Sequence, residues 1–324
     1  MGAFILRRVL IAIPVLIGVT LLAYLLVDLA PGDPVTAMVN PATRAELGQE
    51  WIELRKEQLG LNEPAPVRYL LWLSEVARGN LGYSIIGGQS VSEQIAARVG
   101  PTLLLMGSAL FLGTVIGIPL GVLSAVRQYS RLDYAATIGG FLAISTPSFF
   151  LGLSLVYLFA VRWKVFPSSG MRTLGADDAA LDVLKHMVLP VTVLALAQIP
   201  LVMRYARSTM LEVLRQDYVT TARSKGLGEQ IVLVGHAFRN ALLPLITVMG
   251  LTLPEILSGA VITETIFQWP GMGLLVMRAV SARDYPLIMG TILVTAGMVL
   301  ICNLVADLLY AVADPRIRLS QGRG

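Results

Sequence analysis

Few side chains in this sequence have the types and spacing that catalysis or metal binding requires. The chain has one cysteine, Cys302, and two histidines, His186 and His236. One cysteine excludes an internal disulfide and any multi-cysteine metal or iron–sulfur site, and two histidines provide little for zinc. Neither an H-E-x-x-H motif nor a G-x-x-x-x-G-K-[ST] phosphate loop occurs. We therefore expect a chain that holds no metal or cofactor and does not hydrolyse ATP itself.

Three polar side chains lie within or beside long apolar segments. Glu255 interrupts one such segment, Asp307 follows another, and Asn303 lies one helical turn before Asp307. Where such segments cross a membrane, ionisable groups are costly and tend to face a cavity or a partner. The three residues are therefore candidates for the lining of a translocation path. The alternative is that Glu255 lies near the outer surface and Asp307 among the inner headgroups, solvated or paired with arginine.

The composition indicates that the elements carrying these residues are membrane helices. Of 324 residues, 55% are hydrophobic and 14% are charged, against roughly 45–50% apolar and 25% charged residues in soluble domains. This leaves too little polar surface to cover a water-soluble globule, which argues strongly against a soluble enzyme. The net charge of +4 is small and dispersed, so no nucleic-acid partner is expected.

Six apolar stretches are candidates for helices that cross a bilayer, which needs roughly 20 residues. They are residues 9–27, 101–126, 134–161, 187–203, 240–263 (interrupted by Glu255) and 285–306. The first stretch follows Arg7 and Arg8, but its apolar core is longer than that of a cleaved signal peptide and no small-x-small cleavage site follows. The sequence therefore predicts an all-α integral membrane protein with six transmembrane helices.

Small residues and prolines recur along these spans. Glycine and serine in the second span permit close contact with another helix, although the pattern does not identify that helix. These residues are Gly107, Ser108, Gly113, Gly117 and Gly121. Kinks are the default expectation at Pro119, Pro147, Pro190, Pro200 and Pro244.

The placement of arginine and lysine predicts the orientation of the spans. Arg7 and Arg8 place the amino terminus in the cytoplasm, and alternation then makes residues 127–133, residues 204–239 and the carboxyl-terminal tail cytoplasmic. These three segments are basic, whereas residues 28–100, predicted to be external, carry more acidic than basic residues. We expect a multi-pass protein of the cytoplasmic membrane with both termini in the cytoplasm.

The external segment should form a compact helical cap between the first and second spans. Thr43 with Glu46, and Ser90 with Glu93, have the spacing of capping boxes. Residues 67–78 have a helical pattern that stops at Gly79. The cap is a structural lid, a docking surface for an external partner, or both. We divide the chain into residues 1–100, the first helix with the cap, and residues 101–324, a transmembrane domain with the other five helices.

The cytoplasmic segment 204–239 has the pattern of two amphipathic helices joined by a turn. Gly226 and Gly228 permit a sharp turn, because glycine tolerates positive φ and ends helices. The apolar stripe of the first helix is Leu211, Leu214, Tyr218 and Ala222, and that of the second is Ile231, Val234 and Phe238. Such a loop, anchored in two membrane helices, is suited to transmit force from a partner; the alternative is an ordinary basic surface loop.

Ordered motifs in this segment resemble the "EAA" loop of ATP-binding-cassette (ABC) importer permeases. The motif is Thr220-Thr221-Ala222-Arg223-Ser224-Lys225-Gly226, followed by Leu243-Pro244. Thr220 and Thr221 replace the glutamate and the first alanine of that pattern, while Ala222 and Gly226 match it. The distance of 18 residues from Gly226 to Pro244 is longer than in sugar and phosphate permeases, and resembles the peptide and nickel branch.

Other motifs resemble the first, "B"-type, permease subunit of dipeptide and oligopeptide importers in this branch. They are Pro31-Gly32-Asp33-Pro34, residues 59–73, residues 79–82, residues 166–170, residues 264–273, Asp284-Tyr285-Pro286 and residues 313–316. The resemblance extends over nearly the whole chain. It implies the type I ABC importer permease fold.

The resemblance also implies a function: one half of the translocation path of an ATP-driven importer for di- or oligopeptides. It implies a homologous second permease, one or two cytoplasmic ATPase subunits that bind ATP and magnesium, and an external substrate-binding protein. The residues that would couple this chain to the ATPase are Asp217, Tyr218, Thr220, Thr221, Ala222, Arg223, Ser224, Lys225 and Gly226. Nickel chelates, haem and other small solutes remain alternative cargoes. A stand-alone channel or secondary transporter is disfavoured, because no tandem half-repeat is visible.

Overall fold

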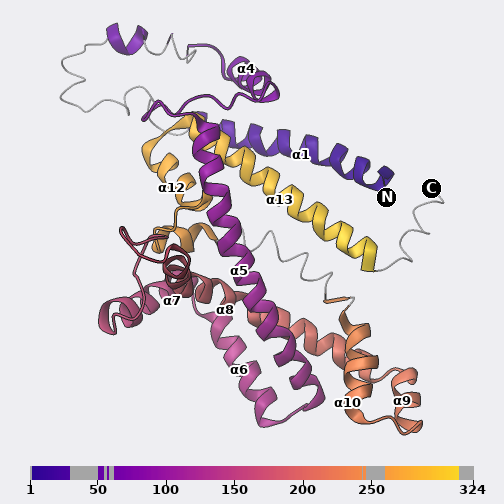
Figure 1. The fold of residues 1–324 in the computed structure, drawn as a ribbon. Helices are drawn as coiled ribbons and strands as arrows, with labels where there is room; N and C mark the ends of the chain where they lie inside the picture. Colours follow the sequence, from indigo (N-terminus) through magenta and orange to yellow (C-terminus); the bar gives the residue numbers. More distant parts are fainter. Residues whose placement is uncertain are drawn as a thin grey trace. The chain divides into compact units, whose positions relative to one another are not determined.

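The structure, a computed structural model, describes residues 2–29, 50–54, 57, 62–242, 244–245 and 260–313. This part of the chain is helical and contains no strand, apart from one bridge between Tyr83 and Ser90 (Figure 1). The helices are α1 (Gly2–Leu29), α4 (Ala65–Ala77), α5 (Val91–Val126), α6 (Arg131–Ser145), α7 (Ser148–Leu155), the π-helix η1 (Val156–Arg162), α8 (Ala179–Leu214), α9 (Asp217–Ser224), α10 (Glu229–Ile231), the π-helix η2 (Val232–Phe238), α12 (Met272–Ala282) and α13 (Tyr285–Ala313). The prediction of an all-α protein is confirmed.

Four of the predicted spans are single helices in the described residues. α1, α5, α8 and α13 are each long and apolar enough to cross a bilayer. α8 stays one helix although it contains Pro190 and Pro200. The predicted fifth span, residues 240–263, lies largely outside the described residues, and Glu255 lies outside them altogether.

The predicted third span is not one straight helix. α6 and the α7–η1 helix are together long and apolar enough to cross a bilayer, but the chain bends by 98° at the break between them. Thr146 there is extended, with ψ of 119°, and Pro147 follows it. The kink expected at Pro147 is therefore confirmed and is a full break in the helix, because proline lacks an N–H and disfavours the helical conformation of the preceding residue.

The chain divides into two compact units. Unit 1 comprises residues 1–102 and 270–300, and unit 2 comprises residues 103–269 and 301–324. In unit 1, the start of α5 packs against α12 and α13 through Val91, Ile95, Met272, Leu275 and Leu287. The predicted helix over residues 67–78 is confirmed as α4. The predicted helix start at Ser90 is confirmed too, although the Ser90 hydroxyl pairs with that of Ser92 at 2.7 Å. The Thr43–Glu46 capping box lies outside the described residues.

A buried carboxylate explains the Asp284-Tyr285-Pro286 motif in unit 1. Asp284 immediately precedes α13, and one carboxylate oxygen accepts from the backbone N–H of Leu287 at 3.4 Å. The same carboxylate accepts from the Ser84 hydroxyl and from the backbone N–H of Ile85, the latter at 3.2 Å. One side chain therefore caps α13 and anchors the turn after α4.

In unit 2, α5 and α8 pack closely through glycines spaced four residues apart. A Cβ atom at Gly113 would lie 2.9 Å from Gln198 Cβ, and one at Gly117 would lie 2.8 Å from Val202 Cβ. At Gly121 it would lie 2.4 Å from the Met203 carbonyl oxygen. The close helix contact is confirmed for these three glycines, with α8 as the partner helix, but not for Gly107, where a Cβ would meet no atom within 4 Å.

Candidate coupling site

The helix α9 contains seven of the nine predicted coupling residues, with Lys225 and Gly226 following it, and it does not continue α8 in phase. α8 runs past the apolar stretch to Leu214, as predicted, and Gln216 is then extended before α9 begins. In α9, Val219 and Ala222 are buried, whereas Tyr218 is 41% exposed. The prediction of a single stripe that includes Tyr218 is therefore wrong, because the break at residues 215–216 resets the helical phase.

The second segment also buries a different face from the predicted one. η2 is a π-helix, in which residues five apart share a face. Val232 and Ala237 are accordingly buried, while Ile231 and Val234 are 57% and 66% exposed. The predicted stripe of Ile231, Val234 and Phe238 assumed 3.6 residues per turn and is wrong for its first two members.

The turn between the two segments depends on one of the two predicted glycines. Gly226 has φ of +79°, the left-handed conformation that glycine adopts without a steric penalty. Its N–H donates to the Arg223 carbonyl at 2.9 Å, as in a helix C-cap. Gly228 has an ordinary φ of −59°, so its backbone conformation does not require glycine.

An ion pair bridges this turn. Arg223 donates from Nε to Glu229 at 3.2 Å and from a terminal nitrogen at 2.7 Å. Hydrogen bonding to Arg223 lowers the pKa of the Glu229 carboxyl, and the same bond raises the pKa of Arg223. Both ends of the bridge are exposed, so it holds the turn locally rather than the whole fold.

We expect acid to loosen this turn. Because the folded pKa of Glu229 lies below its unfolded value of about 4.3, the bridge contributes fully above that value and is lost as pH falls through the folded pKa. Hydrogen exchange of the amides in residues 217–231, corrected for intrinsic rates, should show protection that falls below about pH 4. In Glu229→Gln the protection should be weaker and independent of pH; a wild-type profile that matched this variant would contradict the expectation.

The hairpin, defined as α9 to η2 (residues 217–238), is packed against α8. Val219 and Ala222 form a buried cluster with Val232, against which Val213 and Leu214 of α8 pack. Ala237 of η2 joins a second cluster with Ala125, at the end of α5, and Met210 of α8. A force on α9 would therefore act on the end of α8 directly, and on the end of α5 through η2.

A buried ion pair, not predicted from the sequence, joins α6 to the same end of α8. Arg207 donates to both carboxylate oxygens of Asp133 at 2.9 Å, and Asp133 is buried. Asp133 also accepts from the Tyr129 N–H, while Ser130 caps its backbone N–H. The Ser130-x-x-Asp133 spacing was a sequence signal for a helix start, but nothing local pointed to Arg207.

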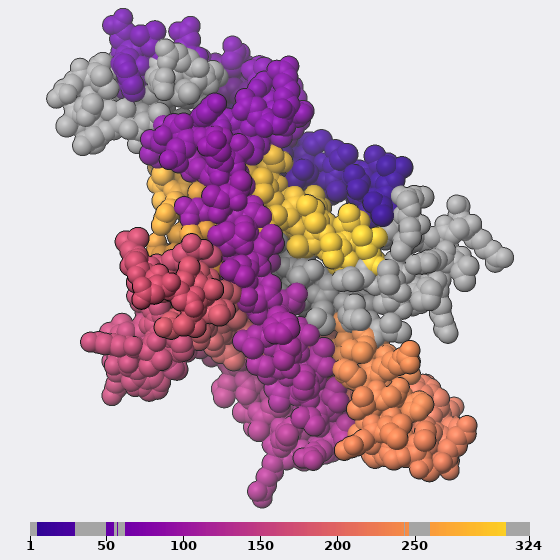
Figure 2. All heavy atoms as spheres, in the orientation of Figure 1, coloured from indigo at the N-terminus to yellow at the C-terminus, as the bar shows by residue number. Residues whose placement is uncertain are grey.

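The solvent-exposed side of the hairpin and of the adjoining end of α8 carries both charged and uncharged side chains. A groove of about 620 Å³ runs along the end of α8, lined by Arg204, Arg207 and Arg215 among others. Of the nine predicted coupling residues, Ala222 is buried and the other eight are exposed. Figure 2 shows the atoms of the hairpin, in orange, at the molecular surface. Arginine and tyrosine, here exposed at Arg215 and Tyr218, are enriched at protein-binding surfaces.

Family models match nearly the whole chain. The model described as "Binding-protein-dependent transport system inner membrane component" matches residues 117–319. Its amino-terminal companion matches residues 1–106. The chain belongs to this family.

Named relatives in this permease family align with nearly the whole of this chain. The oligopeptide transport system permease protein AppB of Bacillus subtilis is 45% identical, over 98% of this chain and 99% of the relative. The dipeptide transport system permease protein DppB of Escherichia coli is 39% identical, over 97% and 98%. The resemblance to peptide-branch permeases is thereby confirmed.

A solved structure supports the fold. A chain of the inward-facing MetNI methionine ABC transporter matches with a TM-score of 0.58 and 16% identity, covering 69% of this chain and 97% of that chain. At this identity the match supports a shared fold and nothing further. It confirms the type I ABC importer permease fold, while the division of the chain after residue 100 stays a prediction.

The other residues singled out from the sequence are not part of the hairpin's core. Asn303 is exposed and Asp307 partly exposed on α13, one turn apart as predicted, and their role in a permease path stays a prediction. His186 is buried, with Nδ1 2.8 Å from the Asp182 carbonyl oxygen. No group of three or more metal-ligating side chains occurs within the described ranges.

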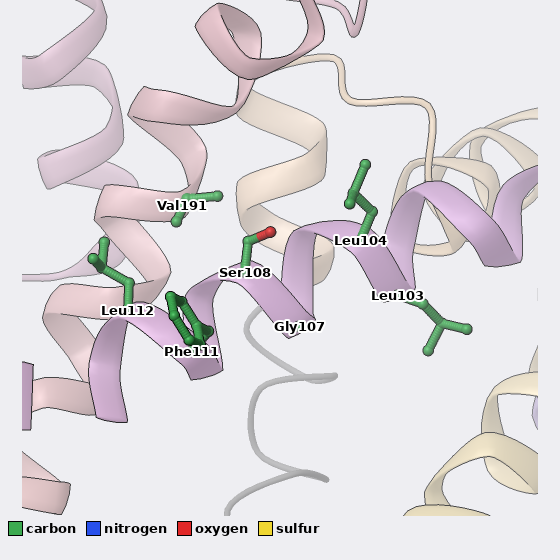
Figure 3. Close-up of a pocket in the computed structure, with 7 residues that line it drawn as sticks. All are labelled: Leu103, Leu104, Gly107, Ser108, Phe111, Leu112 and Val191. Atoms are coloured by element: carbon green, nitrogen blue, oxygen red, sulfur yellow. The ribbon is translucent and has the colours of Figure 1, made fainter. Parts of the chain in front are cut away.

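A second groove lies along α5 of the permease. It measures about 430 Å³ and is lined by Leu103, Leu104, Gly107, Ser108, Phe111, Leu112 and Val191 (Figure 3). Among these lining residues, Ser108 alone offers a hydroxyl. So apolar a surface suits hydrocarbon or an apolar helix and not a peptide backbone, whose polar groups need partners. This groove is therefore a poor candidate for the path of a peptide.

Proposed function

We propose that this chain is a permease subunit of an ATP-driven importer and forms half of the path by which di- or oligopeptides cross the cytoplasmic membrane. The observation that carries this proposal is the identity of 39–45% with permeases named for oligopeptide and dipeptide transport, along nearly the whole chain. The basic segments around residues 127–133 and 204–239 support an orientation with the hairpin and both termini in the cytoplasm.

The hairpin would receive the force that drives transport. The chain has no G-x-x-x-x-G-K-[ST] motif, so ATP and magnesium would be bound by partner ATPase subunits. The exposed side of α9 would dock on such a subunit, while Val219 and Ala222 hold its other side against Val232 and the end of α8. Closure of the nucleotide sites would then tilt α8 and the end of α5. The other proposed partners are a homologous second permease and an external substrate-binding protein.

Gly226 provides a direct test of this coupling. Gly226→Val places a β-branched residue at φ of +79°, which costs about 1–3 kcal/mol and distorts the turn that holds α9. In proteoliposomes with the ATPase subunits and binding protein, we expect peptide uptake per ATP hydrolysed to fall by about tenfold. The quantities measured are labelled-dipeptide uptake and phosphate release.

Two matched variants separate backbone strain from mere bulk. Gly226→Asn should keep most of the uptake, because asparagine tolerates the left-handed conformation. Gly228→Val should also keep it, since Gly228 has negative φ and a Cβ there meets no atom within 4 Å. Unchanged uptake and unchanged stimulation of the ATPase in Gly226→Val would refute coupling through this hairpin.

The cargo is tested separately. The same proteoliposomes should accumulate a labelled dipeptide, and an excess of unlabelled peptide should compete, whereas a nickel chelate or haem should not. Uptake of the chelate or haem in place of the peptide would replace the cargo while leaving the coupling proposal intact.

A further inference from the structure

Unit 1 contains a cavity that the proposed transport function does not use. It lies where the end of α1, α4 and the start of α13 meet, and measures about 450 Å³. Tyr24, Arg68, Trp72, Glu75 and Met289 are among its lining residues. This volume lies within the range of small-molecule sites.

The polar side chains of the cavity wall are charged and balanced. Arg68 pairs with Asp28 at 2.5 Å, and Arg78 pairs with Glu75 at 2.8 Å. All four residues line the cavity, which therefore has two cationic and two anionic groups. Such a wall favours a ligand that carries both charges over one with a net charge.

Two N–H groups in the wall have no acceptor. Arg68 Nε and Trp72 Nε1 are buried, and neither meets a hydrogen-bond acceptor among the described residues. An unsatisfied buried donor costs about 1–3 kcal/mol. A small rotation of either side chain toward the cavity would let a ligand oxygen accept from it, so binding would relieve this cost.

The cavity lies at one end of a helix whose apolar side chains are almost all exposed. In the most apolar 18-residue stretch of α1, only 11% of the residues are buried. Leu22, Leu25 and Leu26, within the last two turns of the helix, are all exposed. Tyr24, Tyr69 and Trp72 form an aromatic cluster there, with ring centroids 5.5 Å and 6.0 Å apart. Tyrosine and tryptophan are enriched at the headgroup level of membranes, which places the cavity where lipid headgroups lie.

We propose that this cavity binds a phospholipid with a zwitterionic headgroup. Its phosphate oxygens accept hydrogen bonds from Arg68 and Trp72. Its ammonium group lies toward Asp28 and Glu75, and its acyl chains cover the exposed leucines of α1. A bound lipid of this kind would fasten α4 to the end of α1, in addition to the hydrogen bond between Tyr69 and Thr20 at 3.0 Å.

The test compares two lipids and a matched pair of variants. The full-length chain is purified in mild detergent and titrated with phosphatidylethanolamine or phosphatidylglycerol of the same acyl chains, and native mass spectrometry counts retained lipids. Ser74→Phe adds a bulky side chain to the cavity wall. Ser281→Phe is its control, because both serines are exposed on helices of unit 1 and donate to their own helix backbone, but Ser281 does not line the cavity.

We expect wild type and Ser281→Phe to retain one more phosphatidylethanolamine than Ser74→Phe. Trp72→Phe keeps the ring but loses the N–H, and should bind this lipid about tenfold more weakly. Equal retention of both lipids by the wild type, equal retention by the two serine variants, or a bound peptide in place of lipid would each overturn the proposal. If Ser74→Phe does not fold, unchanged affinity in Trp72→Phe would overturn it.

Discussion

Gly121→Ala should lower the free energy of unfolding by about 2–3 kcal/mol, although alanine is normally the better helix former. The added Cβ would lie 2.4 Å from the Met203 carbonyl oxygen and 2.6 Å from Ala206 Cβ. A backbone atom cannot rotate away as a side chain can, so α5 and α8 would have to move apart where Gly113, Gly117 and Gly121 lie against α8. Thermal unfolding of the chain in detergent, followed by tryptophan fluorescence, would measure the loss, since Trp269 is buried against both helices.

The same substitution at Gly107 should have the opposite sign. Gly107 lies on the same helix, and a Cβ there meets no atom within 4 Å. Gly107→Ala should therefore stabilise the chain by about 0.5–1 kcal/mol, the usual gain over glycine in a helix interior. Equal effects of the two substitutions would show that the α5–α8 contact does not depend on Gly121.

Arg207→Gln should cost about 3 kcal/mol, because it leaves the buried Asp133 carboxylate without its cation. The Asp133 side chain is 6% exposed and that of Arg207 is 29% exposed. Asp133→Asn should therefore cost less, about 2 kcal/mol, since the arginine left behind is partly solvated. Chemical unfolding of the full chain in detergent would measure both losses.

The double variant tests whether the two residues act as a pair. With Asp133→Asn and Arg207→Gln together, two neutral amides face each other and no buried charge remains, so the total loss should be well below the sum of the single losses. Transport by the assembled complex should recover in parallel if the pair holds α8 in place. Strict additivity would mean that the ion pair does not link α6 to α8.

Local patterns were sufficient for much of the fold. α4 and α8 could be predicted because their signals are local. A stretch without charges predicts a membrane helix, and a proline or glycine marks where a helix begins or ends. The glycines of α5 could also be recognised as sites of close helix contact, although the helix that they contact could not. The bend at Pro147 was underestimated, since the length of the apolar stretch outweighed the known effect of proline on the residue before it.

The candidate site shows where such patterns stop. Tyr218 was assigned to the buried stripe because the break at residues 215–216 has no glycine or proline to announce it. Ile231 and Val234 were wrongly assigned to the buried face because the prediction assumed an α-helix. The π-helix found there depends on packing, in which Val232 and Ala237 contact neighbouring helices that include α8 and α9. Asp133 and Arg207 are 74 residues apart, beyond the reach of any periodicity.

A helical membrane permease with a turn at Gly226 could be recognised from the amino-acid order alone, because hydrophobic stretches, turn-forming glycines and family motifs are properties of short segments. The folded chain was needed to show which side of α9 is buried, which helix contacts the glycines of α5, and which arginine pairs with Asp133. Those outcomes depend on contacts between segments far apart in the chain, whose energies no single segment contains.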